Sequence, residues 1–125
     1  MTMLNLPPTE LTPLVLFEPE GCVLKIEGRV IPSDVEALFA PINQWVDTHL
    51  KSSNELHLLF RLYYFNTSSF KRLYNMCNKL NTYFEKGKKI SVRWEYLTDD
   101  ETGKTDAEEL LEHAKYPYQI VSVEG

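Results

Sequence analysis

The sequence predicts an α/β fold: a single domain over residues 1–125, with a mixed, mostly parallel sheet, an N-terminal antiparallel hairpin and helices packed on the sheet. Three observations indicate this fold. The length of 125 residues, with 43% hydrophobic residues, suits one domain with its own core. Strand-like segments alternate with segments whose apolar residues recur at helical spacing. Because strands joined through helices pair in parallel by right-handed crossovers, most of the sheet should be parallel.

The N-terminal part contains the predicted hairpin. Residues 1–13 are rich in proline and threonine and are expected to form a loose arm or a short edge segment. Two short apolar runs follow in residues 14–28, separated by Glu18-Pro19-Glu20-Gly21. Proline and glycine between strand-like runs favour a tight turn, so these runs predict two antiparallel strands.

The first helix is predicted to begin after Ser33. Ser33 with Glu36 three residues later matches a capping box, which indicates a helix start. Pro41 conflicts with an unbroken helix because its ring clashes with the preceding turn. A kink is therefore expected there, or a main helix that begins near Pro41. The helix should bury one apolar stripe, formed by Val35, Leu38, Phe39, Ile42, Trp45, Val46, His49 and Leu50.

The middle of the chain predicts a strand and a second helix. The nearly continuous apolar run "ELHLLFRLYYF", residues 55–65, is typical of a central strand buried on both faces. The helix that follows should end at Gly87, a residue type that suits the position just past a helix, and Lys86, Lys88 and Lys89 suit its negative end. Its apolar stripe consists of Phe70, Leu73, Tyr74, Cys77, Leu80 and Phe84.

Two more strands and a short helix complete the predicted domain. "KISVRWEYL" alternates, with Ile90, Val92, Trp94 and Tyr96 on one side and Ser91, Arg93 and Glu95 on the other, which predicts a half-buried strand. The polar segment after it should contain a turn around Gly103 and a short helix capped by Thr105 or Asp106. "YQIVSVEG" predicts the last strand.

Composition argues against several classes of function. The net charge is −5 and no Lys/Arg-rich run is present, so nucleic acid is not an expected partner. No apolar run approaches the roughly 20 residues that span a bilayer, so membrane insertion is not expected either. The N-terminus lacks the basic and apolar regions of a signal peptide, which predicts a cytoplasmic protein.

Residues that bind metals or carry out catalysis do not form a recognisable pattern. Cys22 and Cys77 lack metal-ligand spacing and are expected to be buried thiols. His49, His57 and His113 lie on three different predicted elements. The acidic residues at 99–101 do not match a calcium-binding loop, and no glycine-rich nucleotide loop or nucleophile elbow is present. The sequence therefore predicts neither a cofactor nor an enzyme.

One polar stretch remains, where the predicted central strand passes into the second helix. Asn66 is followed by three hydroxyl residues, Thr67, Ser68 and Ser69. In open α/β sheets this edge often carries binding sites, and the free N–H groups of a helix start favour an anion. A hydroxyl here can cap the helix, or it can be the attachment point of a phosphate. The residues alone leave both readings open.

A family resemblance favours the phosphorylation reading. The plan of strands and helices, with small hydroxyl residues before a helix, resembles STAS-like anti-anti-sigma proteins, which carry Asp where this chain has Asn66. More closely, the chain resembles the SiaC family of bacterial regulatory phosphoproteins over roughly residues 21–120, through the segments "LYYFNTSSFK" (62–71), "YFEKGKKISVRWEY" (83–96) and "APINQWVDTHL" (40–50). The stretch "YFNTSS" is the most specific part of this match.

The resemblance implies a phosphorylation switch rather than catalysis. It implies that Thr67 is phosphorylated by a dedicated protein kinase and dephosphorylated by a PP2C-type phosphatase, with Ser68 as a secondary site. It also implies that the unmodified protein binds and activates a diguanylate cyclase, and so controls cyclic-di-GMP and biofilm formation. The expected partner-binding residues surround Thr67: Asn66, Ser68, Ser69, Phe70, Lys71, Tyr74 and Asn75.

Two other functions stay open at this point. The chain could be a constitutive protein-interaction adaptor of the same fold that is not phosphorylated. It could also be a small STAS-like domain that uses residues 66–69 to bind a ligand or a nucleotide phosphate, although it has no glycine-rich loop.

Overall fold

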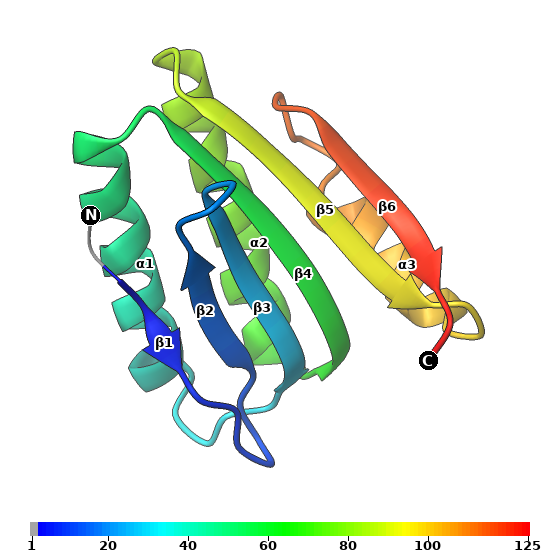
Figure 1. Ribbon diagram of the computed structural model, residues 1–125. Helices are drawn as coiled ribbons and strands as arrows, with labels where there is room; N and C mark the ends of the chain where they lie inside the picture. Colours follow the sequence, from blue (N-terminus) through cyan, green and yellow to red (C-terminus); the bar gives the residue numbers. More distant parts are fainter. Residues whose placement is uncertain (1–2) are drawn as a thin grey trace.

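The computed structural model describes residues 3–125 and contains one sheet and three helices (Figure 1). The elements alternate along most of the chain, as the sequence predicts. In chain order they are β1 (Asn5–Leu6), β2 (Leu14–Glu18), β3 (Val23–Val30), α1 (Val35–Ser52), β4 (Glu55–Phe65), α2 (Thr67–Glu85), β5 (Lys89–Leu97), α3 (Glu101–Leu110) and β6 (Tyr118–Val123).

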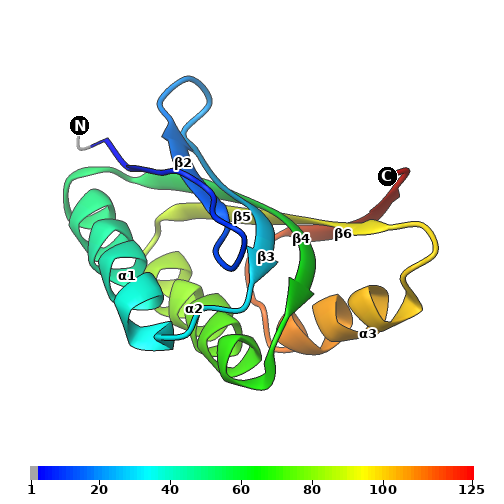
Figure 2. The same cartoon turned by 90° about the horizontal axis from the view of Figure 1, so that it is seen from below.

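The six strands lie in the sheet in the same order as in the chain. β1, β2 and β3 pair antiparallel, which confirms the N-terminal hairpin, and β3, β4, β5 and β6 pair in parallel. Each parallel strand is added on the same side of the previous one. Because such crossovers are right-handed, all three helices must lie on one face of the sheet, and Figure 2 shows them there.

This one-sided arrangement corrects the prediction for β4. The sequence predicts a central strand buried on both faces, but burial alternates along β4, with Leu56, Leu58, Phe60 and Leu62 buried against the helices. The residues between them lie on the other face of the sheet and are only partly buried. The polar residues Glu55, His57 and Arg61 all lie on this face and were a sign of it in the sequence, but the apolar Leu59 interrupts the alternation.

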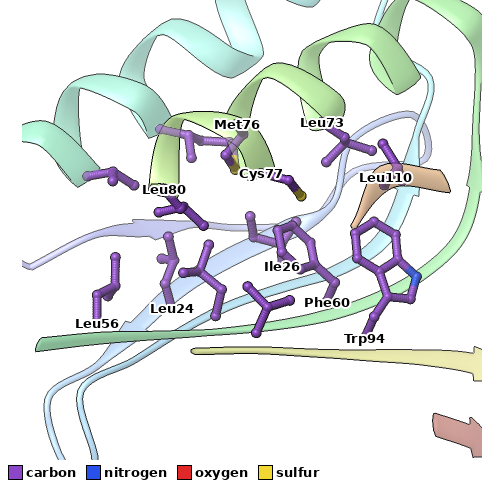
Figure 3. Packing of buried hydrophobic residues seen from close by; sticks show 14 of the residues in the cluster. Leu24, Ile26, Leu56, Phe60, Leu73, Met76, Cys77, Leu80, Trp94 and Leu110 are labelled. Atoms are coloured by element: carbon purple, nitrogen blue, oxygen red, sulfur yellow. The ribbon is translucent and has the colours of Figure 1, made fainter. Parts of the chain in front are cut away.

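The core lies between the sheet and the helices (Figure 3). Leu73, Cys77 and Leu80 of α2 occupy the predicted stripe and are almost fully buried. Beneath them the rings of Phe60 and Trp94 stack, with centroids 4.5 Å apart. Each large apolar side chain buried here contributes about 1.5–3 kcal/mol to the free energy of folding, so this layer is a main source of stability.

The N-cap of α1 differs from the prediction. The helix is capped by Asp34, whose side chain accepts a hydrogen bond from the N–H of Ala37 at 3.1 Å, and not by Ser33. Aspartate and serine cap equally well, so their order in the chain could not decide between them. The helix also runs through Pro41 as one element. Its buried stripe, including Phe39, Ile42 and Trp45, holds both halves against the sheet.

The end of α2 agrees with the prediction, whereas the start of α3 does not. Gly87 has a φ of +92° just after the C-cap of α2, which confirms it as the stop. α3, however, is capped by Asp100, whose side chain accepts from the N–H of Gly103 at 2.9 Å. The prediction of a turn at Gly103 and a cap at Thr105 or Asp106 was therefore wrong, and these residues lie inside α3.

The uncovered face of the sheet carries charged side chains instead of a second layer of helices. Arg61 of β4 contacts Glu27 at 3.0 Å and Glu95 at 2.5 Å, and Arg93 contacts Glu95 at 2.9 Å. Glu95 is only 5% exposed, although the alternation of β5 places it on the polar side. Its hydrogen bond from Arg61 lowers the pKa of the Glu95 carboxyl below its usual value. We call Glu27, Arg61, Arg93 and Glu95 the ion-pair row.

None of the helices in the described part of the chain is long and apolar enough to cross a lipid bilayer.

Candidate functional site

The polar stretch 66–69 lies where β4 ends and α2 begins. Asn66 is the N-cap of α2, with extended backbone angles. Its side-chain oxygen accepts a hydrogen bond from the N–H of Ser69 at 3.0 Å, and its own N–H donates to the carbonyl of Val30 on β3 at 3.3 Å. The cap that the sequence requires is thus supplied by the asparagine, and none of the three hydroxyl residues is needed for it.

The three hydroxyl residues have three different environments. Thr67 is exposed. Ser68 is also exposed, but its hydroxyl donates to the side-chain oxygen of Asn66 at 3.2 Å. Ser69 is fully buried, and its hydroxyl has no hydrogen-bond partner among the described residues. Thr67 is therefore the residue of the three that combines an accessible side chain with a position outside the capping hydrogen bonds.

The surroundings of Thr67 favour a negative charge. Thr67 and Ser68 are the first two residues of α2, so no preceding turn supplies carbonyls to their N–H groups. The first turn contains no acidic residue, and Lys71 is exposed one turn further along the helix. Arg72 is already paired with Glu36 of α1. The helix dipole, the free N–H groups and Lys71 would together stabilise an anion on the Thr67 side chain.

The predicted partner-binding residues divide by exposure. Lys71 and Asn75 are exposed and follow Thr67 at intervals of four residues, so these three residues form one stripe along α2. Phe70 and Tyr74 are partly buried: Phe70 stacks on Phe65 with ring centroids 6.2 Å apart, and Tyr74 lies edge-on to the ring of His113.

Ser69 is the prediction that the geometry contradicts. Its side chain is closed off beneath the first turn of α2, so it cannot contact a partner in this conformation. The helical period explains the difference: Ser69 lies four residues before Leu73 and therefore on the same buried face of α2. Counting from Leu73 back along the helix would have revealed this before the structure was known.

Two tyrosines beside the site were missed. Tyr63 and Tyr64 are 46% and 59% exposed, although the run of aromatics predicts a buried strand. The pairing of β4 with β5 ends at Arg61 opposite Glu95, so the last residues of β4 have no partner in β5. A register shift between β3 and β4 also leaves Tyr63 without a partner in β3. A hollow of about 320 Å³ opens beside these residues. It is lined by both tyrosines, Phe65, Trp94 and Asp106 among others. Two consecutive aromatics in an alternating strand were the available signal, since one of them must point away from the core.

Another hollow, of about 540 Å³, lies on the uncovered face of the sheet, over residues of β4, β5 and β6. His57 is its central polar group, and both ring nitrogens are engaged: Nδ1 with the hydroxyl of Ser91 and Nε2 with the carboxylate of Glu55, each at 2.5 Å. The hydrogen bond with His57 lowers the pKa of the Glu55 carboxyl. These groups satisfy one another, so the hollow offers a ligand little free hydrogen-bonding capacity.

The remaining candidate residues from the sequence are His49, Cys77 and Cys22. His49 is buried, stacks on Trp45 with ring centroids 4.8 Å apart, and contacts the carbonyl of Glu55 at 2.9 Å. Cys77 is buried as predicted, and burial raises the pKa of its thiol to about 12. Cys22 is only partly buried, which differs from the prediction. No group of three or more potential metal ligands occurs within residues 3–125.

Comparisons with known proteins show which family and which solved structures this chain resembles. The family of regulatory phosphoproteins named SiaC matches residues 6–123. An uncharacterized protein of Pseudomonas aeruginosa (strain UCBPP-PA14) is 31% identical over 121 residues, which cover 96% of both chains. The crystal structure of apo-SiaC from Pseudomonas aeruginosa is 30% identical, with a TM-score of 0.88 over 98% of this chain and 100% of that one.

A second solved structure contains a partner. It is the crystal structure of the diguanylate cyclase SiaD in complex with its activator SiaC, also from Pseudomonas aeruginosa. The matching chain is 30% identical, with a TM-score of 0.90, and the match covers 96% of this chain and 99% of that one.

Proposed function

The chain belongs to the SiaC family of regulatory phosphoproteins, and from this premise we propose that it is a non-enzymatic switch whose phosphorylation site is Thr67. The observation that carries the proposal is the sorting of the three hydroxyl residues. Thr67 alone is exposed and free of the capping hydrogen bonds, at a helix start that favours negative charge. The family resemblance points to the same residue.

A dedicated protein kinase adds the phosphate and a PP2C-type phosphatase removes it. Both enzymes must reach the hydroxyl, which the exposed position of Thr67 permits. Ser68 is the secondary site, because its hydroxyl must first break its hydrogen bond to Asn66. The free thiols of Cys22 and Cys77 suit the reducing cytoplasm, where we expect the exchange to occur.

The effector of the unmodified protein is a diguanylate cyclase, which it binds and activates. Support comes from the similar SiaC chain, which was solved in complex with the cyclase that it activates. The contact surface consists of the exposed residues Ser68, Lys71 and Asn75 around Thr67. The partly buried Asn66, Phe70 and Tyr74 lie at its border, and Tyr63 and Tyr64 lie beside it. Through the cyclase the switch controls cyclic-di-GMP and biofilm formation.

Phosphorylation acts by changing the charge of this surface. It places about −1.5 to −2 charges on the first residue of α2 without requiring the helix to unfold. Lys71 and the helix N-terminus stabilise the phosphate while it faces water. When a partner covers the site, the dianion loses its hydration, and without a matching cation this costs several kcal/mol. A cost of that size weakens a micromolar complex about a hundredfold or more.

The test compares binding of the cyclase to four forms of the protein by calorimetry: wild type, Thr67→Ala, Thr67→Glu and protein phosphorylated at Thr67. Thr67→Ala should bind as tightly as wild type, and the phosphorylated form about a hundredfold more weakly. Thr67→Glu should fall between them, since one carboxylate has less charge than a phosphate. Ser68→Ala is the matched control and should keep both binding and its sensitivity to phosphorylation.

Wild-type affinity in both Thr67→Glu and the phosphorylated protein would refute the switch. The constitutive adaptor would then remain, and intact-mass and phosphosite mapping of protein from cells, with and without phosphatase treatment, would show whether Thr67 is modified at all. The ligand-binding alternative predicts heat on titration with GTP, ATP or cyclic-di-GMP. The satisfied polar groups of the hollow beside His57 argue against binding there.

A further inference from the structure

The two edges of the sheet differ in how they are protected. β1 forms one edge and has only two residues, and short edge strands give little opportunity for pairing. β6 forms the other edge with six residues, Tyr118–Val123, and is the outermost strand on that side in Figure 1. An exposed strand edge carries a row of unpaired N–H and C=O groups that can accept another strand.

The outward-pointing groups of β6 can be identified from its bonds to β5. The N–H of Val92 donates to the carbonyl of Pro117 at 3.2 Å, and the N–H of Thr98 donates to the carbonyl of Val123 at 3.0 Å. In a strand the N–H and C=O of alternate residues point to opposite sides. Gln119 and Val121 therefore also face β5, whereas the backbone groups of Tyr118, Ile120 and Ser122 point outward from the sheet.

β6 lacks the features that usually block an edge. Its sequence, "YQIVSV", contains no lysine, no proline and no other charged residue. Ile120, Val121 and Val123 are β-branched, and together with Tyr118 they give the segment a high preference for strand pairing. Tyr118 is 45% exposed, so part of this apolar surface faces water.

Charges at the two ends of β6 specify which strand fits there. Lys115 precedes the strand and Glu124 follows it. Two copies of β6 in antiparallel orientation bring Glu124 of one copy close to Lys115 of the other, although Lys115 also contacts the exposed Glu85 of its own chain. A parallel arrangement would place like charges together. The charge pattern is therefore self-complementary for an antiparallel pair of identical strands.

We propose that β6 pairs antiparallel with β6 of a second copy of this chain, which joins two six-stranded sheets into one continuous sheet. The pairing is centred on Ile120, so that Ile120 faces its equivalent and Tyr118 faces Ser122 of the other copy. In this register the outward N–H and C=O groups of all three residues find partners. The two-fold axis stands perpendicular to the sheet, and the helices of both copies lie on the same face.

The dimer should be weak and reversible, because an interface built around one strand pair is at the small end of those found in proteins. Thr67 lies on a different part of the molecule, at the start of α2, so the proposal does not depend on phosphorylation. The variant Thr67→Ala should dimerise as wild type does, which separates a failure of this proposal from a failure of the switch.

The test combines sedimentation equilibrium of the full chain with amide NMR, from micromolar to near-millimolar concentration. The signals of Tyr118, Ile120 and Ser122 should shift with concentration and exchange more slowly in the dimer, whereas those of Gln119 and Val121 are already bonded to β5 and should change less. Ser122→Lys places a charge on this edge and should weaken association about tenfold or more.

Asn5→Lys is the matched control. Asn5 is exposed on the β1 edge, and its backbone groups point outward, since the carbonyl of the preceding Leu4 bonds to β2. This variant should dimerise as wild type does, and both lysine variants should keep the wild-type melting temperature. A wild-type chain that stays monomeric at near-millimolar concentration would overturn the proposal, as would equal association of all three proteins. Loss of cyclase binding in Ser122→Lys, with a monomeric wild type, would assign the edge to the cyclase instead.

Discussion

The two faces of the sheet are made by the same strands but are stabilised in different ways. On the helix-covered face, Phe60 and Trp94 pack with the apolar stripes of the helices. On the uncovered face, Arg61 and Glu95, each the next residue in its strand, form ion pairs. The alternation of β4 and β5 specifies the two sides of the sheet, whereas the direction in which strands are added specifies which side receives the helices.

The uncovered face also shows how a sheet can do without a second layer of helices. A wholly apolar face would be an exposed patch that favours aggregation. The ion-pair row covers this face with charged groups that are paired across three strands, β3, β4 and β5. The low exposure of Glu95 is acceptable because two arginines offset the cost of removing its carboxylate from water.

The largest expected effect concerns the covered face. Trp94→Ala should lower the free energy of unfolding by about 3–5 kcal/mol, because it removes a fully buried ring and leaves a cavity beside Phe60. Urea denaturation followed by circular dichroism measures this loss. A loss below about 1 kcal/mol would mean that hydrocarbon packing on this face is not the main source of stability.

A smaller effect is expected from the ion-pair row. The pKa of Glu95 is lower in the folded protein than in the unfolded chain, so its contribution is fully present above the unfolded pKa and is lost as the pH falls through the folded pKa. Glu95→Gln should lower the free energy of unfolding by about 1–3 kcal/mol at neutral pH, since it removes charge-assisted hydrogen bonds. Below about pH 4.3 the stability of this variant should depend less on pH than that of wild type.

Urea denaturation of wild type and Glu95→Gln across the acidic range checks this prediction. Asp99→Asn is a suitable control, because Asp99 is an exposed carboxylate outside the row. If Glu95→Gln kept the full acid sensitivity of wild type, the uncovered face would not depend on this carboxylate for its stability.

The smallest effect is expected for Ser69, a polar residue on the buried side of α2. The buried hydroxyl of Ser69 has no hydrogen-bond partner among the described residues. Ser69→Ala should leave stability unchanged or raise it by up to about 1 kcal/mol, because the cost of removing the hydroxyl from water disappears. Asn66→Ala is the contrasting variant, and loss of the cap should cost about 1 kcal/mol. A clear loss of stability in Ser69→Ala would reveal a role for its hydroxyl.

Local sequence patterns specify most of the helices and strands and the position of the candidate site. The alternation of β5, the stripe of α2 and its stop at Gly87 depend on local periodicity and backbone preference, which neighbouring residues specify. The same is true of the motif at 66–69, whose position between a strand and a helix could be read from the chain. Its family resemblance singled out Thr67, and the exposure of that residue agrees.

Which surfaces are covered depends on the packing of segments that are distant in the chain. The half-exposed face of β4, the burial of Glu95 and the exposure of Tyr63 and Tyr64 all depend on what lies opposite each residue. Those neighbours come from segments far apart in the chain, and the sheet order that brings them together is not encoded in any short pattern. Local sequence specifies the direction in which a side chain points, and the fold as a whole specifies what it meets there.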